Sequence, residues 1–345
     1  NVAPLINFDA LFADGTREYR MPEEPMAGDT VTLRFRTARD NVDEVVIVSN
    51  LGRVTMQKVF DDQLFDYYEG TLELSDFKVE YYFEVHCGHL VCYYHTKGIS
   101  MDVQEYYNFF IMPGFQVPEW AKGAVFYQIY VDRFYNGNPD NDVLDREYSY
   151  IGECSNRVTD WGKYPAAMGV REFYGGDLQG VMEKLDYLQE LGVDAIYFNP
   201  LFVSPSNHKY DIQDYDYIDP HVACIVKDEG ELLPEGCLEN SRASRYICRV
   251  TAKENLEASN AYFATFVEEV HKRGMKVILD GVFNHCGSFN KWLDREGIYQ
   301  GVKDYPDGAY ASADSPYRSF FCFEEEAWPD NPHYAGWWNH PTLPK

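Results

Sequence analysis

The chain has 345 residues, of which 45% are hydrophobic and 25% are charged, and this composition excludes a mainly disordered protein. Its net charge of −26 argues against nucleic acid and anionic membranes as partners, because both repel an acidic surface. No apolar run approaches the ~18–20 residues that span a bilayer, and the first residues lack the pattern of a signal peptide. The length predicts about two domains. We expect a cytoplasmic protein, or a secreted one if its start has been trimmed.

Residues 1–117 have the pattern of an all-β domain. Polar and apolar residues alternate from Thr30 to Phe35, and turn residues separate one strand-like run from the next. The expected strands cover residues 30–36, 43–49, 66–74, 78–87 and 90–94. Short strands at this spacing predict a β-sandwich of the immunoglobulin-like kind, and the prolines and glycine at 113–118 mark its end.

From residue 122 onward, strand and helix patterns alternate. The expected elements are a strand at 124–131, a helix at 177–191, a strand at 193–198, a helix at 259–273 and a strand at 276–283. This order predicts an α/β unit with parallel strands, in which functional side chains follow the carboxyl ends of the strands. The stretch 199–256 is expected to be a long irregular excursion, and its acidic run at 227–239 a solvated loop face.

The segment after the first of these strands is rich in side-chain oxygens. Asn136, Asn138, Asn141 and Asp142 fall within seven residues, and clustered oxygen ligands suit a hard cation such as calcium. A turn rich in Asn, Asp, Gly and Pro that holds no metal explains the same residues, so both interpretations stay open here. Further along, Asp177 is expected to cap the helix that follows it.

The end of the third strand carries an acid, an amide and an imidazole. Asp280, Asn284 and His285 form the pattern D-x-x-x-N-H, which can orient a hydroxyl group of a substrate. The alternative is a hydrogen-bonded set that satisfies the end of the strand. Cys286 follows directly, and since no base marks it as a nucleophile, we expect an ordinary thiol.

These motifs together resemble a known family. Residues 126–137, FYQIYVDRFYNG, resemble the first barrel strand of neopullulanases and cyclomaltodextrinases in the alpha-amylase family of glycoside hydrolases. The resemblance to this subgroup, which includes the maltogenic amylases, extends to FYGGDLQG at 173–180, SPSNHKYD at 204–211, DGVFNH at 280–285, GWW at 336–338 and LPK at 343–345. Residues 1–117 are similar to the N-terminal starch-binding-type module of the subgroup.

The resemblance implies a (β/α)8 TIM barrel, of which residues 118–285 supply the first three βα units. Residues 286–345 then correspond to the start of the domain that protrudes between barrel strand 3 and its helix. The family is implied to cleave glycosidic bonds with retention, which needs a carboxylate nucleophile and a carboxylic acid about 5–5.5 Å apart. The family's G-x-R-x-D nucleophile motif on strand 4, its acid on strand 5 and its Asp on strand 7 have no counterpart here. We therefore expect the remaining C-terminal part of the enzyme to be this chain's partner.

The resemblance also assigns roles to single residues. Tyr210 matches the ring that stacks under the sugar at the cleavage subsite, and His208 lies beside it. His285 matches the histidine that hydrogen-bonds the outer hydroxyl of the same sugar. Asp280 matches the aspartate that braces the strand-4 arginine.

A calcium site of the subgroup is matched by Asn136, Asn138, Asn141, Asp142, the Gly175 carbonyl and Asp177. The usual Asp is Asn138 in this chain, which removes one negative charge and weakens calcium binding.

The function implied by the resemblance is hydrolysis of α-1,4 glucosidic bonds, with α-1,6 bonds open as well, in starch-derived oligosaccharides, cyclodextrins or pullulan. The alternative is a non-catalytic glucan-binding or scaffold protein, because this chain lacks the acid and the nucleophile. By analogy with the subgroup, the N-terminal domain is expected to mediate a homodimer. The insert between Pro220 and Asn260 is longer than the subgroup leads us to expect.

Overall fold

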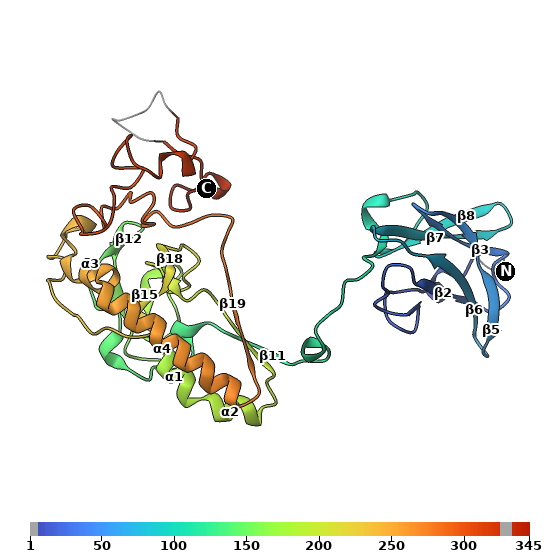
Figure 1. Cartoon of the computed structure of the whole chain (residues 1–345), viewed down its shortest axis with the longest axis horizontal. Coiled ribbons are helices and arrows are strands. Elements are labelled where there is room, and N and C mark those ends of the chain that lie inside the picture. Colours follow the sequence, from blue (N-terminus) through green and yellow to red (C-terminus); the bar gives the residue numbers. More distant parts are fainter. Residues whose placement is uncertain (1–5, 325–332) are drawn as a thin grey trace. The chain divides into compact units, whose positions relative to one another are not determined.

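The computed structural model of the chain describes residues 6–324 and 333–345. The chain forms two compact units, Asn1–Lys122 and Gly123–Lys345 (Figure 1). The division falls shortly after the stretch of prolines and glycine at 113–118.

The N-terminal unit is a β-sandwich, as predicted. One sheet has the order β1 (Arg20–Met21), β2 (Thr30–Ala38), β6 (Phe65–Glu73) and β5 (Gln57–Asp61). The other has the order β4 (Gly52–Thr55), β3 (Glu44–Ser49), β7 (Val79–Cys87), β8 (Leu90–His95) and β9 (Gly98–Ser100), with β10 (Phe109–Ile111) also paired to β7. The predicted strands are confirmed to within two residues at each end, whereas the short strands were missed because two to five residues give no clear alternation.

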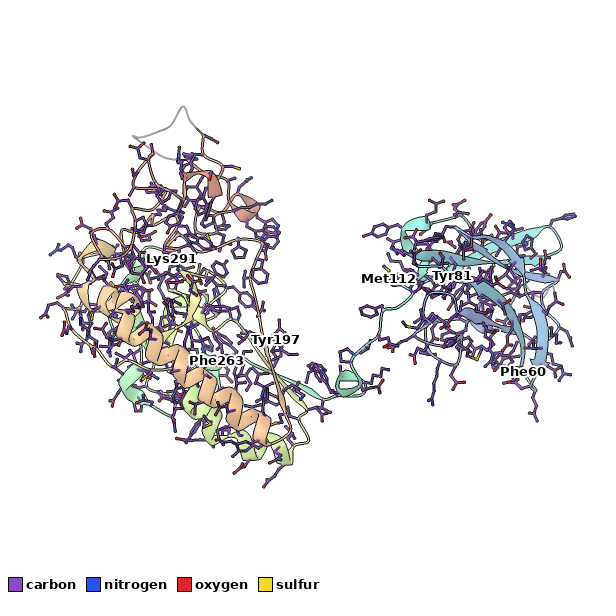
Figure 2. All side chains as sticks on the ribbon, in the orientation of Figure 1. Phe60, Tyr81, Met112, Tyr197, Phe263 and Lys291 are labelled. Atoms are coloured by element: carbon purple, nitrogen blue, oxygen red, sulfur yellow. The ribbon has the colours of Figure 1, made fainter. Side chains whose placement is uncertain are left out.

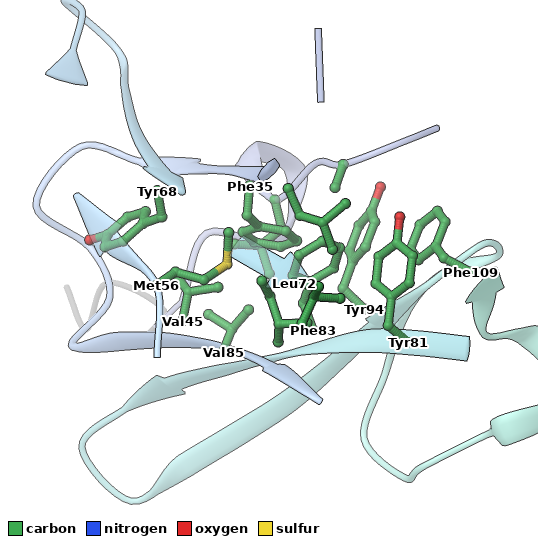
Figure 3. Close-up of a cluster of buried hydrophobic side chains, with 14 of the residues drawn as sticks. Phe35, Val45, Met56, Tyr68, Leu72, Tyr81, Phe83, Val85, Tyr94 and Phe109 are labelled. Atoms are coloured by element: carbon green, nitrogen blue, oxygen red, sulfur yellow. The ribbon is translucent and has the colours of Figure 1, made fainter. Parts of the chain in front are cut away.

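The two sheets bury one core between them (Figure 3). Along β2 every second residue is buried, so that Val31, Leu33 and Phe35 face inward. The Phe35 ring meets the Phe83 ring of the opposite sheet with a centroid separation of 4.8 Å. This interdigitation is what alternation in a sandwich strand produces.

The second unit is built on the parallel sheet β11 (Phe126–Ile129), β16 (Ala195–Phe198) and β19 (Lys276–Leu279). The register pairs Ile129 with Phe198 and Phe198 with Leu279, so the carboxyl ends of the three strands are level. This confirms a partial (β/α) barrel arrangement of the predicted kind.

Helices α1 (Leu178–Glu183), α2 (Leu185–Glu190) and α4 (Lys253–Lys272) lie along this sheet (Figure 1). Their apolar stripes bury Val181, Leu185, Leu188 and Phe266 against the strands, and Phe263 of α4 packs on the same core (Figure 2). Phe126 of β11 points to the opposite face and is exposed, and Leu279 at the end of the edge strand β19 is exposed as well. None of the helices in the described part of the chain is long and apolar enough to cross a membrane.

Two predicted helices need correction. The helix expected at 177–191 is broken at Lys184, whose ψ of 6° leaves the α-helical region while its N–H bonds to the Val181 carbonyl. The apolar stripe continues across the break, which is why the sequence pattern did not reveal it. The helix expected at 259–273 already begins at Lys253, and α3 (Ser244–Thr251) precedes it within the stretch predicted to be irregular. The buried face of α3 includes Arg249, and a charged residue there hides the apolar period.

The remaining strands are short and lie in loops above the sheet. They are β12 (Ser149–Tyr150) with β13 (Glu153–Cys154), β14 (Asn156–Arg157) with β15 (Glu172–Phe173), and β17 (Phe202–Val203) with β18 (Asp214–Ile218). Residues from 286 onward contribute a small cluster around Cys286, Leu293, Ala309 and Phe321.

The sandwich core predicts a large cost for Phe83→Ala. Phe83 is 1% exposed, and truncating a buried phenylalanine costs about 3–5 kcal/mol. Hydrogen–deuterium exchange of the β2 and β7 amides should report a loss of this size in the free energy of opening. The control is Phe110→Ala, because Phe110 is 56% exposed, and its opening free energy should change by less than about 1 kcal/mol. Equal losses in both variants would contradict this account of the core.

Candidate functional site

Polar side chains gather at the level carboxyl ends of the parallel strands. Tyr130 follows β11, Asn199 follows β16 and Asp280 follows β19. Asn199 Oδ1 accepts a hydrogen bond of 2.7 Å from Gln128 of β11, so adjacent strands are linked at this edge. The edge is where side chains of enzymes with parallel sheets meet their substrates.

The loop between β17 and β18 brings Tyr210 to Asp280. The Tyr210 hydroxyl donates a 3.0 Å hydrogen bond to Asp280 Oδ2 across 70 residues of sequence. Burial and this bond raise the pKa of Tyr210 to about 12, so the phenol keeps its proton. The Asp280 carboxylate also raises the pKa of Tyr197 on β16, a residue labelled in Figure 2. Asp280 thus holds two phenol rings at the strand ends.

Two histidines complete this group. The rings of His208 and Tyr210 lie 5.9 Å apart, and His208 Nδ1 accepts a 3.1 Å hydrogen bond from the Tyr210 backbone N–H. Burial lowers the pKa of His285. The charge of Asp211 and a hydrogen bond between His285 and the backbone of Tyr210 act in the opposite direction. The structure therefore brings His208, Tyr210, Asp280 and His285 together.

An apolar hollow of about 720 Å³ opens beside His285. The His285 ring stacks on Trp337 with centroids 6.1 Å apart, and the Trp292 ring stacks on Tyr215 at 5.6 Å. The Tyr215 hydroxyl donates to the carbonyls of Val282 and His285 at 2.7 and 2.8 Å. Aromatic faces next to hydrogen-bonding groups suit a ligand with both apolar and hydroxyl surfaces, such as a sugar. Cys286 also lines the hollow, and burial raises the pKa of its thiol to about 12, so it is not a nucleophile.

The predicted oxygen-rich loop folds into a cradle around Gly175. Asn136 Nδ2 donates a 2.8 Å hydrogen bond to Asp142 Oδ1. A Cβ on Gly175 would lie 2.4 Å from both of these atoms, so only glycine fits. Asp142 also forms an ion pair with Arg157, and burial raises the pKa of Asp142 to about 6 despite that charge.

Asp177 ties the cradle to helix α1. Its Oδ1 accepts from the N–H of Gly180 at 2.6 Å, which confirms the predicted cap. The same carboxylate accepts from the N–H groups of Gly137 and Asn138 at 3.0 and 2.8 Å. The side chain of Asn138 caps a turn instead, because its Oδ1 accepts from the Asp140 N–H at 3.2 Å.

The cradle has oxygen atoms suited to a cation. Within the described residues, Asn136 Oδ1 and Asn141 Oδ1 are buried and accept no hydrogen bond. Leaving such atoms unpaired costs free energy, which a bound cation would remove. No group of three or more His, Cys, Asp or Glu side chains among the described residues is arranged for a metal, so amide and carbonyl oxygens would supply most of the ligands.

Two residues at this edge escaped the sequence analysis. Asp132 Oδ1 accepts from the N–H groups of Tyr174 and Gly175, and thereby joins the end of β11 to the cradle. Asn207 Oδ1 accepts a 2.5 Å bond from the Tyr130 hydroxyl. The position of Asp132 directly after a strand was the available signal, whereas Asn207 is placed by a contact between distant segments.

Comparison with known proteins agrees with this architecture of a β-sandwich unit and part of a (β/α) barrel. The family model described as the alpha amylase catalytic domain matches residues 128–223 and 258–342, and that of the alpha amylase N-terminal ig-like domain matches residues 23–116. The chain belongs to the alpha-amylase family.

Among curated relatives, the chain is 32% identical to a cyclomaltodextrinase of Thermoanaerobacter pseudethanolicus, over 85% of this chain and 48% of that protein. It is 33% identical to neopullulanase 2 of Thermoactinomyces vulgaris, over 81% and 42% respectively. The chain thus spans about half or less of the length of these relatives. The solved type III pullulan hydrolase from Thermococcus kodakarensis matches 97% of this chain and 50% of its own, with a TM-score of 0.52 and 27% identity.

The environment of His285 predicts an imidazole that titrates below the ordinary pKa of about 6.5. Because the folded pKa is depressed, the contribution of His285 to stability is present above the unfolded pKa of about 6.5, and it is lost as the pH falls from there through the lower folded pKa. An NMR titration of the imidazole nitrogens should give a midpoint below 6.5. In Asp211→Asn the midpoint should fall further, since the charge of Asp211 favours the protonated ring. A midpoint at or above 6.5 in the unaltered chain would contradict the burial argument.

Proposed function

We propose that this chain supplies the sugar-holding part of the active site of an α-glucan hydrolase. The observation that carries the proposal is the joining of Tyr210 to Asp280 by a 3.0 Å hydrogen bond at the level ends of the barrel strands. The names of the similar proteins, cyclomaltodextrinase and neopullulanase, support a substrate made of α-linked glucose.

Each residue of the group has a role in this proposal. The Tyr210 ring stacks on the apolar face of a glucose unit, and Asp280 holds the phenol in that orientation. His285 is uncharged near neutral pH and hydrogen-bonds a hydroxyl of the same sugar, while Trp337 closes the far side. His208 lines the same subsite. The phenol of Tyr210 and the uncharged imidazole of His285 suit a neutral substrate, because a charge that faces the sugar would have to be desolvated.

The chemistry proposed for the complete site is retaining hydrolysis of α-1,4 bonds, with α-1,6 bonds as further candidates. It needs a nucleophilic carboxylate and an acid on facing sides of the bond. The G-x-R-x-D motif is absent from this sequence, so we propose that both groups come from a further segment which pairs with the exposed sheet. The alternative of a non-catalytic glucan-binding protein keeps the same sugar contacts. Dimerisation through the N-terminal domain and a cytoplasmic location stay predictions.

We also propose that calcium binds in the cradle. The unpaired oxygens of Asn136 and Asn141, the carboxylates of Asp142 and Asp177 and the carbonyl of Gly175 would hold it, with Asn138 as the further predicted ligand. A cation there would stabilise the loop after β11 against the start of α1, and thereby the wall of the sugar site.

The calcium proposal predicts a calcium-dependent stability. After chelation, calcium at 100 times its Kd should stabilise the protein by about 2.7 kcal/mol, seen as a rise in the Tm of the second unit. Asn136→Ala and Asn141→Ala should lose most of this rise. The exposed Asn156→Ala is the matched control and should keep it. An unaltered Tm on adding calcium to the chelated wild type would remove the proposal.

The sugar proposal predicts that the chain binds maltotriose without cleaving it. Tyr210→Ala should weaken binding in calorimetry by about tenfold or more, because it removes the stacking ring. Tyr187→Ala removes a tyrosine that is 52% exposed on α2 and should bind as the wild type does.

Reducing-sugar assays on starch, pullulan and cyclodextrin complete this test. Sugar release by the purified chain would disprove the proposed origin of the carboxylates. Absence of glucan binding would disprove the sugar site itself.

A further inference from the structure

A line of alternating charges is buried beneath the loop that carries His208 and Tyr210. Lys209 Nζ lies 2.6 Å from Asp219 Oδ2, and Asp219 Oδ1 lies 2.9 Å from His221 Nδ1. On its other side, His221 Nε2 lies 2.7 Å from Glu147 Oε1. These four side chains are at most 5% exposed.

The line continues into the insert that the alpha-amylase model leaves unmatched between residues 223 and 258. Glu147 Oε2 accepts a 2.9 Å hydrogen bond from Arg249 Nη1 on α3. Arg249 Nε and Nη2 both donate to the Asp228 carboxylate at 2.8 Å. Arg245, one turn earlier on α3, also holds Asp228 with two bonds of 2.9 Å. The acidic run at 227–239 was predicted to be a solvated loop face, and its acidic residues are exposed, as predicted. Asp228 is exposed and also pairs with the two arginines.

Electrostatics explains why these groups stay together. A charge taken out of water is expensive unless an opposite charge and hydrogen bonds replace the lost solvent. Burial opposes ionisation of Asp219, yet Lys209 and His221 hold the pKa of this carboxyl below its usual range. Burial likewise opposes protonation of His221, yet Glu147 and Asp219 raise the pKa of the imidazole. Each charge therefore depends on the next one along the line.

Lys209 connects this line to the sugar site. Its backbone has a φ of +59°, in the left-handed region that non-glycine residues rarely adopt. Such a conformation persists only where the surroundings hold it in place. The buried ammonium group of Lys209, fixed by Asp219, provides that hold, and the residues on either side are His208 and Tyr210.

Arg249 also reaches the oxygen cradle. Its Nη1 donates a 3.0 Å hydrogen bond to the backbone carbonyl of Asp142. A single guanidinium thus contacts the insert at Asp228, the charge line at Glu147 and the cradle loop at Asp142. Arginine suits such a place because its planar fork carries five donors, whereas the ammonium of lysine is a single point.

We propose that Arg249 is a positioning residue, through which the insert fixes the loop that presents His208 and Tyr210 to a glucan. The identification of these two residues as glucan contacts rests on the function proposed above. Arg249 acts through Glu147, His221, Asp219 and Lys209 and does not touch the sugar itself.

A matched pair of conservative variants tests this role. Arg249→Lys keeps the charge but cannot reach three partners at once. Arg245→Lys makes the same change one turn away, where the guanidinium bonds to Asp228 alone among the described residues. Maltotriose affinity is measured by calorimetry. The imidazole nitrogen signals of the nine histidines are recorded without sugar, with His208 assigned through His208→Gln.

Arg249→Lys should weaken maltotriose binding by about 3- to 30-fold and shift or broaden the His208 signal, while its Tm stays within a few degrees of the wild type. Arg245→Lys should leave both the affinity and the His208 signal unchanged. Wild-type affinity and an unmoved His208 signal in Arg249→Lys would overturn the proposal. Equal effects of the two variants would also overturn it, because they would indicate a general loosening of the insert.

The two readouts separate this inference from the proposed function. If the wild-type chain binds no maltotriose, the proposed function fails, and the His208 signal of the sugar-free protein still decides the inference. If Arg249→Lys does not fold, the same measurements are made on Asp228→Asn, which releases Arg249 on its more exposed side. A shifted His208 signal in Asp228→Asn then supports the positioning role, and an unchanged one overturns it.

Discussion

The level carboxyl ends of β11, β16 and β19 are the constraint on which the candidate site depends. The register of the parallel ladder sets Ile129, Phe198 and Leu279 side by side, and the chain must leave the sheet at each of these points. Residues far apart in sequence therefore meet, as Tyr210 and Asp280 do. The helices bury the face of the sheet on which Ile129 and Phe198 lie, so this geometry is held by apolar packing that takes no part in ligand contact.

Loops that leave such an edge must satisfy their own polar groups, because little regular structure does it for them. Aspartate side chains accept many of these backbone hydrogen bonds in this chain. Asp132 and Asp177 each accept from two or more backbone N–H groups, and Asp219 accepts from the N–H groups of Ser204 and His221. Short carboxylates can accept several bonds at once, and charged acceptors make stronger hydrogen bonds than neutral ones. Buried aspartates thus order these loops. The composition shows an excess of acidic residues, but it does not tell which of them are buried and which lie on the surface.

The features that could be predicted from the sequence are those set by residues close to one another along the chain. The alternation of Val31, Leu33 and Phe35 and the stripe of Leu185 and Leu188 are local periodicities, and they predicted the sandwich and the parallel unit. The cap at Asp177 is local too, since its partner is three residues away. The residues of the cradle were recognised as a cluster from the sequence. Their separate roles were not predicted, because these depend on the loop conformation: Asn138 caps a turn, while Asn136 and Asn141 keep unpaired oxygens.

Contacts across long separations could not be predicted in this way. Glu147 and Arg249 are 102 residues apart, and neither lies in a pattern that distinguishes it from a surface charge. Resemblance to a family did not help with Arg249 either, since the family model has no match for the segment that holds this residue.

The attachment of the insert shows how apolar and charged contacts divide their roles. Tyr246 and Val250 of α3 are buried in the cluster with Tyr148, and the rings of Tyr148 and Tyr246 lie 4.1 Å apart. Apolar burial of this kind is favourable but tolerates small shifts of one element along another. The bonds of Arg249 do not tolerate such a shift, because a displaced guanidinium would leave Glu147 buried and unpaired. Apolar contacts therefore supply the attraction, and the buried ion pairs from Arg249 to Lys209 select one position of α3. An element that holds the proposed binding loop in place requires such a single position.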